Sequence, residues 1–250
     1  MVFPLYDKNP FIFKSPPYVT WGLIAATIAV FVWMVSVEIS GSNSKTAVLL
    51  SLTFTPAGVG PNLIPAAFVP WPFTLVSYAF LHGSILHLIG NMAFLWVFGD
   101  DVEEALGHLR FLLFYLLSAA AGALGHWASD PASDIPLIGA SGAVAGIVGA
   151  YLMLHPCRKI WVLAFARIPI RLAAQWVIGA WLALQYFNIL VGADQDVAWW
   201  THIAGFAAGA LLVVFLRRPG VKLFDCDADR LVQNQSAPPL KHWPKRVDTQ

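Results

Sequence analysis

Long apolar stretches separated by short polar connections recur along the chain. A helix needs about 20 apolar residues to span the hydrocarbon core of a bilayer. On this criterion the pattern predicts membrane-spanning helices near residues 18–38, 83–99, 109–128, 139–155, 172–192 and 198–216. The second and fourth of these stretches are short. The expected fold class is an all-α polytopic membrane protein with a six-transmembrane-helix bundle.

The connection between the first two predicted spans, residues 39–82, differs from the others in length and composition. It is too long for a plain hairpin and too apolar for an ordinary exposed loop. The sequence therefore predicts a partly embedded loop that contains short helices.

Composition agrees with a membrane protein and excludes several other classes. Of 250 residues, 58% are hydrophobic and only 12% are charged, and the mean hydropathy is +0.67. A soluble domain needs a more polar surface. The net charge is +1 and the basic residues are scattered, so no nucleic-acid partner is expected. No cleavable signal peptide is expected, because the first 17 residues are rich in proline and lack a small-residue cleavage site after an apolar run.

The basic residues predict the orientation, because Lys and Arg that flank spans stay on the cytoplasmic side. They gather in alternate connections: Lys8, Lys14, Arg110, Arg158, Lys159, Arg167, Arg171, Arg217, Arg218 and Lys222. The opposite side has only Lys45, so both termini are expected to be cytoplasmic. Cys157 and Cys226 fall on the same reducing side and are expected to be free thiols.

These patterns divide the chain into three expected parts. Residues 1–17 form a cytoplasmic N-terminal segment, and residues 18–216 form the membrane domain. Residues 217–250 are polar and Pro-rich, which predicts a flexible cytoplasmic tail.

The fourth predicted span begins with a serine between glycines, in "IGASGAVAG" (residues 138–146). Serine in a membrane helix usually bonds to its own backbone, so Ser141 alone also has an ordinary structural interpretation. His202 lies in the first turns of the sixth span, which enters from the same side. An ionisable group inside a span is costly and is a functional candidate by default. Histidine is the usual base for a serine nucleophile, so Ser141 and His202 predict a catalytic pair.

Small residues on these two spans favour their close approach. Gly142, Gly146 and Gly149 form a stripe on the fourth span, and Gly205 and Gly209 follow His202 by three and seven residues. Such faces let helix backbones pack closely in lipid. This packing is what a Ser141–His202 hydrogen bond of roughly 3 Å requires.

The second predicted span supplies possible oxyanion donors. His87 and Asn91 are four residues apart and therefore share one helix face. Acyl transfer needs donors for the negative oxygen of its intermediate, and the Ser141 amide in the first turn of its helix is a third candidate. His82 is expected to be structural, bonding within the long loop.

Other polar residues are given no catalytic role. His126 and His155 are expected at the membrane interfaces. Asp194 and Asp196 lie in an outer connection and are not expected to complete a triad with His202. The acidic cluster on the cytoplasmic side is expected to be a connection and a helix start: Asp100, Asp101, Glu103 and Glu104.

The blocks "HGSILHLIGN", "GASGAVAG" and "HIAGFAAG", in this order and on alternate spans, resemble the rhomboid intramembrane serine proteases of the bacterial type. The resemblance covers about residues 18–216. It implies a dyad of Ser141 as nucleophile and His202 as general base, with His87, Asn91 and the Ser141 amide as the oxyanion site. It also implies transmembrane protein substrates, no cofactor, an inner-membrane location, an aqueous cavity open to the outer side, and a fifth span that acts as a lateral gate.

Two positions depart from the pattern of the family. Many members have Trp-Arg in the first loop where this chain has Trp71-Pro72. The position four after the serine is often an aromatic packed on the histidine, and here it is Ala145. Phe206 or Trp200 is the expected replacement for that aromatic.

Two other hypotheses belong to different classes. A rhomboid-like protein that binds membrane clients without catalysis has no need to retain Ser141, His202, His87 and Asn91 together. A metal-dependent hydrolase or a metal transporter would use His82, His87, His126 and His202, but the chain has no H-E-x-x-H motif and, apart from Glu38 at the very end of the first, no carboxylate within a predicted span.

Overall fold

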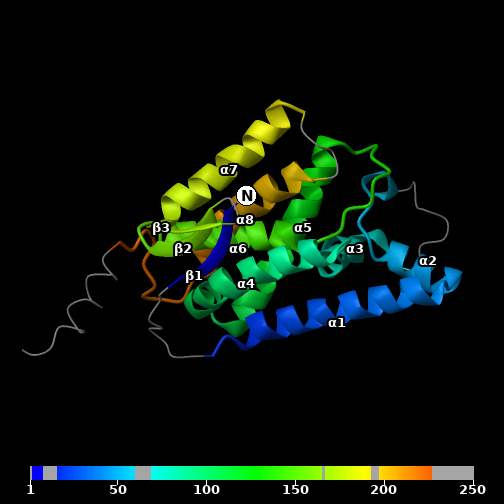
Figure 1. Cartoon of the computed structure of the whole chain (residues 1–250), viewed down its shortest axis with the longest axis horizontal. Coiled ribbons are helices and arrows are strands. Elements are labelled where there is room, and N and C mark those ends of the chain that lie inside the picture. The colour runs from blue at the N-terminus through cyan, green and yellow to red at the C-terminus, as the bar shows by residue number, and fades with distance from the viewer. Residues whose placement is uncertain (1, 8–15, 60–68, 165–166, 193–196, 227–250) are drawn as a thin grey trace, which may run out of the picture.

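Long helices in the computed structural model lie where the apolar stretches predict them (Figure 1). The structure describes residues 2–7, 16–59, 69–164, 167–192 and 197–226. The helices at the six predicted positions are α1 (Tyr18–Ser40), α4 (Ile85–Leu106), α5 (His108–Ser129), α6 (Ser141–Leu154), α7 (Ala174–Leu190) and α8 (Trp199–Leu216). Among the described helices, α1, α4, α5 and α8 are long and apolar enough to cross a membrane. The protein is therefore an integral membrane protein, while α6 and α7 are shorter, with 14 and 17 residues.

A small β-sheet corrects the all-α prediction. Strands β1 (Val2–Asp7), β2 (Lys159–Ala164) and β3 (Ile168–Ala173) form an antiparallel sheet in the order β1-β2-β3. In β2, Ile160 and Val162 are buried while Trp161 is exposed, which is the alternation of a half-buried strand. The sheet was missed because β2 and β3 lie in a basic connection and β1 pairs with β2 across about 160 positions of sequence.

The connection between α1 and α4 contains short helices, as predicted. These are α2 (Asn43–Ser51), η1 (Pro56–Gly58), α3 (Trp71–Ser77) and η2 (Tyr78–Phe80). In Figure 1, α2 lies at the opposite end of the bundle from the sheet. Phe54 and Leu137 exchange two backbone hydrogen bonds, which tie this connection to the segment before α6. Embedding of the connection in the bilayer stays a prediction.

Helix α6 is the centre of the bundle. Eleven of its residues are buried: Gly142, Ala143, Val144, Ala145, Gly146, Ile147, Val148, Gly149, Ala150, Tyr151 and Leu154. It packs against α4, α5 and α8. Because nearly every face of α6 meets another helix, its small residues set how closely the bundle can pack.

The acidic cluster lies within the last turns of α4, not in a connection at a helix start. Glu103 is 1% exposed and reaches the N-terminus of α1, where it accepts hydrogen bonds from the backbone N–H groups of Val19 and Thr20 (2.9 and 2.7 Å). It also contacts Nδ1 of His108 at 2.5 Å. A carboxylate at this position accepts hydrogen bonds from the free N–H groups of α1. Its negative charge also interacts favourably with the positive end of the α1 helix dipole.

The segment after α8 is bound to the bundle up to residue 226, which corrects the prediction that a flexible tail starts at 217. Arg218 N donates to Ala105 O, Phe224 N to Met153 O and Asp225 N to Leu154 O. The remainder of the predicted tail, 227–250, lies outside the described residues, as do Lys8, Lys14 and His242.

This docking also corrects the prediction of free thiols. Cys157 and Cys226 form a disulfide, with their Cα atoms 5.1 Å apart. The backbone bonds of Phe224 and Asp225 place Cys226 beside the end of α6, where Cys157 follows. A sequence separation of 69 residues gave no hint of this pairing.

Candidate active site

The backbones of α6 and α8 touch through glycines next to Ser141 and His202. A Cβ on Gly205 would lie 2.1 Å from the carbonyl oxygen of Gly142, and a Cβ on Gly209 would lie 2.0 Å from that of Gly146. Gly142 directly follows Ser141, and Gly205 is three residues after His202. The start of α6 therefore lies directly against the second turn of α8, one turn beyond His202.

Ser141 is the first residue of α6, directly after the N-cap Ala140. N–H groups in the first turn of a helix have no partner within that helix and point out of its N-terminus. Ser141 is partly exposed, whereas residues 142–151, which follow it in α6, are buried. Its hydroxyl thus lies at the boundary between the packed bundle and accessible space.

His202 is held by residues of α7 and by a neighbouring tryptophan. Its Nδ1 lies 2.8 Å from Oε1 of Gln185. The Trp181 ring is 6.0 Å from the imidazole between centroids, and the Trp199 ring is 6.1 Å away in an edge arrangement. The expectation that Phe206 or Trp200 supports His202 is corrected: Phe206 packs on Trp181, and Trp200 is exposed.

His87, on α4, lies against the segment that leads into α6. A Cβ on Gly139 would lie 2.5 Å from Cε1 and 2.7 Å from Nε2 of the His87 ring. Gly139 also has φ +117°, a conformation that residues with side chains rarely adopt. The glycine two residues before Ser141 therefore makes room for this imidazole.

We expect Gly139→Ala to impair the site more than the fold. The added methyl group strains the backbone and displaces the His87 ring, so any activity that depends on His87 should fall by about tenfold or more. Gly22→Ala is the matched control, because a Cβ there meets nothing within 4 Å. Equal turnover of the native chain and Gly139→Ala in the same detergent would contradict this placement of His87.

Asn91 is bound to His82, and His82 also reaches the residue before Ser141. Asn91 Nδ2 lies 3.0 Å from His82 Nε2, and Ala140 N donates to the same ring nitrogen at 3.4 Å. The rings of His82 and His87 are 5.1 Å apart. His82 was expected to bond within its own loop, and its ring also links α4 to the start of α6.

The remaining sequence candidates lie elsewhere. Asp194 and Asp196 fall outside the described residues. His126 is in the last turn of α5, and His155 is the C-cap of α6. Within the part of the chain that the structure describes, no group of three or more His, Cys, Asp or Glu side chains could hold a metal ion. The metal hypothesis therefore gains no support among these residues.

Sequence reasoning missed Gln185 and the linking role of His82. Gln185 stands alone as a polar residue in "WLALQYF", and a polar side chain in an apolar helix could have signalled it. His82 lies nine residues before Asn91 and outside α4, so a shared helix face could not predict their contact, and only the loop geometry brings them together.

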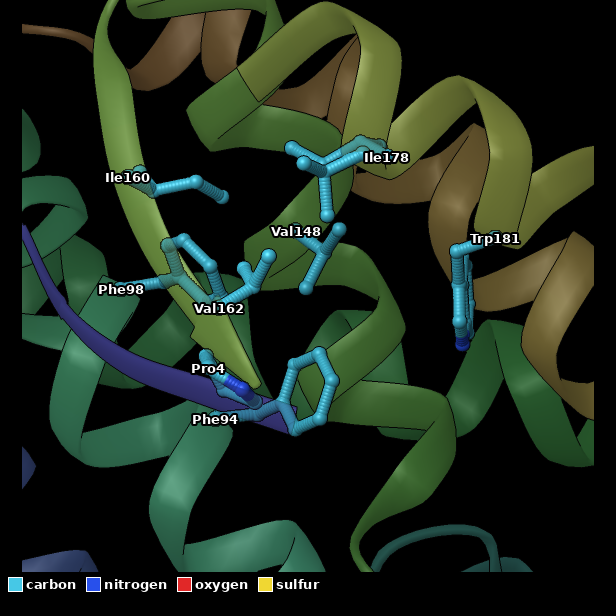
Figure 2. A pocket seen from close by; sticks show the side chains of 9 residues that line it. Pro4, Phe94, Phe98, Val148, Ile160, Val162, Ile178 and Trp181 are labelled. Atoms are coloured by element: carbon cyan, nitrogen blue, oxygen red, sulfur yellow. The ribbon is translucent and has the colours of Figure 1, made fainter. Parts of the chain in front are cut away.

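An apolar cavity lies between α4, α6, α7 and the sheet, and Figure 2 shows the side chains that surround it. It is lined by Pro4, Phe94, Phe98, Val148, Ile160, Val162, Val177, Ile178 and Trp181. The lining suits apolar side chains better than a polar ligand. Trp181 belongs both to this cavity and to the surroundings of His202.

Comparison with known proteins finds that the chain is similar to rhomboid proteins. Residues 71–219, more than half of the chain, match the Rhomboid domain. The rhomboid protease GlpG of Pectobacterium atrosepticum is 32% identical over 199 residues, which cover 80% of this chain and 62% of that protein. The rhomboid protease GluP of Bacillus subtilis is 38% identical over 139 residues, which cover 56% of this chain and 25% of that protein.

A mitochondrial relative, rhomboid protein 1 of Saccharomyces cerevisiae, is 35% identical over 158 residues, which cover 60% of this chain and 43% of that protein. The chain spans less than two thirds of the length of each of these three relatives. The region that matches the Rhomboid domain runs from the start of α3 to just beyond α8 and contains the blocks around His87, Ser141 and His202. The chain therefore belongs to the rhomboid family.

Proposed function

We propose that the protein is an intramembrane serine endopeptidase that cleaves peptide bonds in or near transmembrane segments of membrane-protein substrates. The observation that carries this proposal is the contact between the first turn of α6 and the second turn of α8, where Gly205 lies on Gly142. This contact puts the helix starts that bear Ser141 and His202 side by side. Named proteases among the relatives add support.

In the proposed reaction Ser141 Oγ attacks the scissile carbonyl carbon while His202 accepts the hydroxyl proton. The tetrahedral intermediate then collapses, and His202 gives this proton to the leaving amine. The same imidazole then deprotonates a water molecule, whose oxygen attacks the acyl carbon. The bond to Ser141 Oγ breaks, the imidazole returns the proton to this oxygen, and the acyl group leaves as the carboxyl end of the second product. These steps require only side chains and water, so the proposal includes no cofactor.

The oxyanion of the intermediate needs donors that are already in place. The Ser141 amide at the start of α6 is one candidate, aided by the positive end of the helix dipole. His87, against Gly139, and Asn91 are the others. Because His82 binds Asn91 and the Ala140 amide, it would hold this donor set in place.

The length of α6 supports a reaction below the membrane surface. Its 14 residues extend about 21 Å at the α-helical rise, less than a hydrocarbon core of about 30 Å. If the end of α6 lies at the cytoplasmic surface, Ser141 lies within the bilayer, short of the outer surface. Both termini on the cytoplasmic side and access of water and substrate from the outer side complete the proposed topology, with the basic ends of the helices inside. The Cys157–Cys226 disulfide then lies on the cytoplasmic side, where such bonds are rare.

Labelling with a fluorescent fluorophosphonate tests the activated serine directly. We expect the detergent-solubilised chain to be labelled, and we expect Ser141→Ala and His202→Ala to lose the label. Ser118→Ala is the matched control, since this buried serine on α5 finds no hydrogen-bond partner for its hydroxyl among the described residues. Labelling of the native chain should not change when a metal chelator is added.

Two outcomes would favour a client-binding protein without catalysis. One is a folded native chain that stays unlabelled. The other is Ser141→Ala labelled as strongly as the native chain. Loss of labelling on chelation would instead point to a bound metal ion.

A further inference from the structure

Gln185 is a buried polar residue on α7, a helix that buries few of its other side chains. Of the residues of α7, only Ala174, Ile178 and Gln185 are buried. Gln185 is 4% exposed. Burying an amide costs free energy unless it is hydrogen-bonded, so the partners of Gln185 must satisfy both of its ends.

Both ends of the amide have partners, and these partners define its orientation. Its Nε2 donates to the backbone oxygen of Trp181 at 3.2 Å. A carbonyl oxygen can only accept, so the amide nitrogen must face Trp181 and the amide oxygen must face His202. That oxygen lies 2.8 Å from His202 Nδ1.

This orientation determines where the proton of neutral His202 resides. An amide oxygen cannot donate, so Nδ1 must carry the hydrogen and donate it to Gln185 Oε1. Neutral imidazole has a single N–H, which leaves the lone pair on Nε2. A general base for a serine needs this tautomer, with Nδ1 held and Nε2 free.

We propose that Gln185 is a positioning residue that holds His202 in the tautomer and ring orientation needed to accept the Ser141 proton, an inference that rests on the proposed function. During attack the proton of Ser141 Oγ moves to Nε2, and Nδ1–H stays bonded to Gln185 throughout. The chain thus uses a neutral amide from α7 where other serine hydrolases use a carboxylate. The rings of Trp181 and Trp199 restrict the imidazole from its sides.

Steady-state kinetics on a reconstituted single-span substrate give the first test. Gln185→Met keeps the length of the side chain and removes the acceptor, so kcat should fall by about tenfold while KM changes by less than about twofold. Gln175→Met is the matched control, because Gln175 is an exposed glutamine on the same helix. Gln185→Glu keeps an acceptor and should restore kcat to within about threefold of the native value.

Nitrogen NMR gives a second readout, because it reports the tautomer of His202 in the native chain itself. In protein labelled with ¹⁵N at the histidine rings, the His202 signal is identified by its loss in His202→Ala. At a pH where the ring is neutral, we expect the Nδ1–H tautomer in the native chain and a mixture in Gln185→Met. An Nε2–H tautomer in the native chain would overturn the proposal, as would equal kcat losses in Gln185→Met and Gln185→Glu.

Ser141→Ala in the same assays separates the two proposals. If Ser141→Ala turns over substrate like the native chain, the proposal that the chain is a serine protease fails. If Ser141→Ala is inactive but Gln185→Met keeps the native kcat, only the positioning role fails.

Discussion

Ser141→Ala is expected to abolish cleavage of a transmembrane substrate in proteoliposomes, with a loss of about 10³-fold or more. Without the hydroxyl no acyl-enzyme can form, and the remaining donors only bind the substrate. A suitable probe is a single transmembrane helix with an alanine or glycine before the expected scissile bond. The fragments are separated on a gel, and their ends are identified by mass spectrometry.

A variant that combines Ser141→Ala with His202→Ala gives a stricter test of this prediction. Residues that act as one unit in catalysis are strongly non-additive. We therefore expect Ser141→Ala with His202→Ala to be no slower than Ser141→Ala alone. Losses that multiply in the double variant would show that His202 contributes independently of Ser141, and residual cleavage at the native rate by Ser141→Ala would remove the serine from the mechanism.

Gly205→Ala is expected to destabilise the protein and to remove fluorophosphonate labelling. The new Cβ would lie 2.1 Å from Gly142 O and 2.9 Å from Gly142 C, both backbone atoms that cannot rotate away. Helices α6 and α8 must then separate, at a cost near the upper end of the ~1–3 kcal/mol typical of overpacking. Thermal unfolding in detergent, followed by labelling, measures both effects.

Gly179→Ala is the control for this substitution. A Cβ at Gly179 meets nothing within 4 Å, and alanine favours a helix by about 1 kcal/mol relative to glycine. This variant should therefore be as stable as the native chain or slightly more stable, and fully labelled. A native unfolding temperature in Gly205→Ala would contradict the close contact of α6 and α8.

Ala145 shows how a departure from the family pattern is accommodated. Its small side chain is 1% exposed within α6 and provides no ring to support His202. In this chain Trp181 of α7 and Trp199 of α8 contact the imidazole. The support therefore comes partly from α7, the helix that also provides Gln185. Pro72 lies in the first turn of α3, a position that tolerates proline.

Helix positions could be predicted from the sequence because apolar length is a local property. The start of α1 coincides with the predicted start at residue 18, and α8 begins one residue after its predicted start. The end of α4 was missed by seven residues, because the four acidic side chains resemble a connection. Glu103 tolerates burial there because α1 presents free N–H groups to it and His108 lies beside it.

The sequence by itself determined the class of protein, the places of the long helices and the residues that carry the proposed chemistry. Hydrophobicity determines the protein class and the places of the helices. The residues of the proposed chemistry can be identified because an apolar chain contains few side chains that are able to carry out acyl transfer. The tertiary structure alone decided the β-sheet, the Cys157–Cys226 disulfide, the link from His82 to Asn91 and the contact of Gln185 with His202. Each of these joins segments whose spacing along the chain does not encode their distance, so only the packed backbone brings them together.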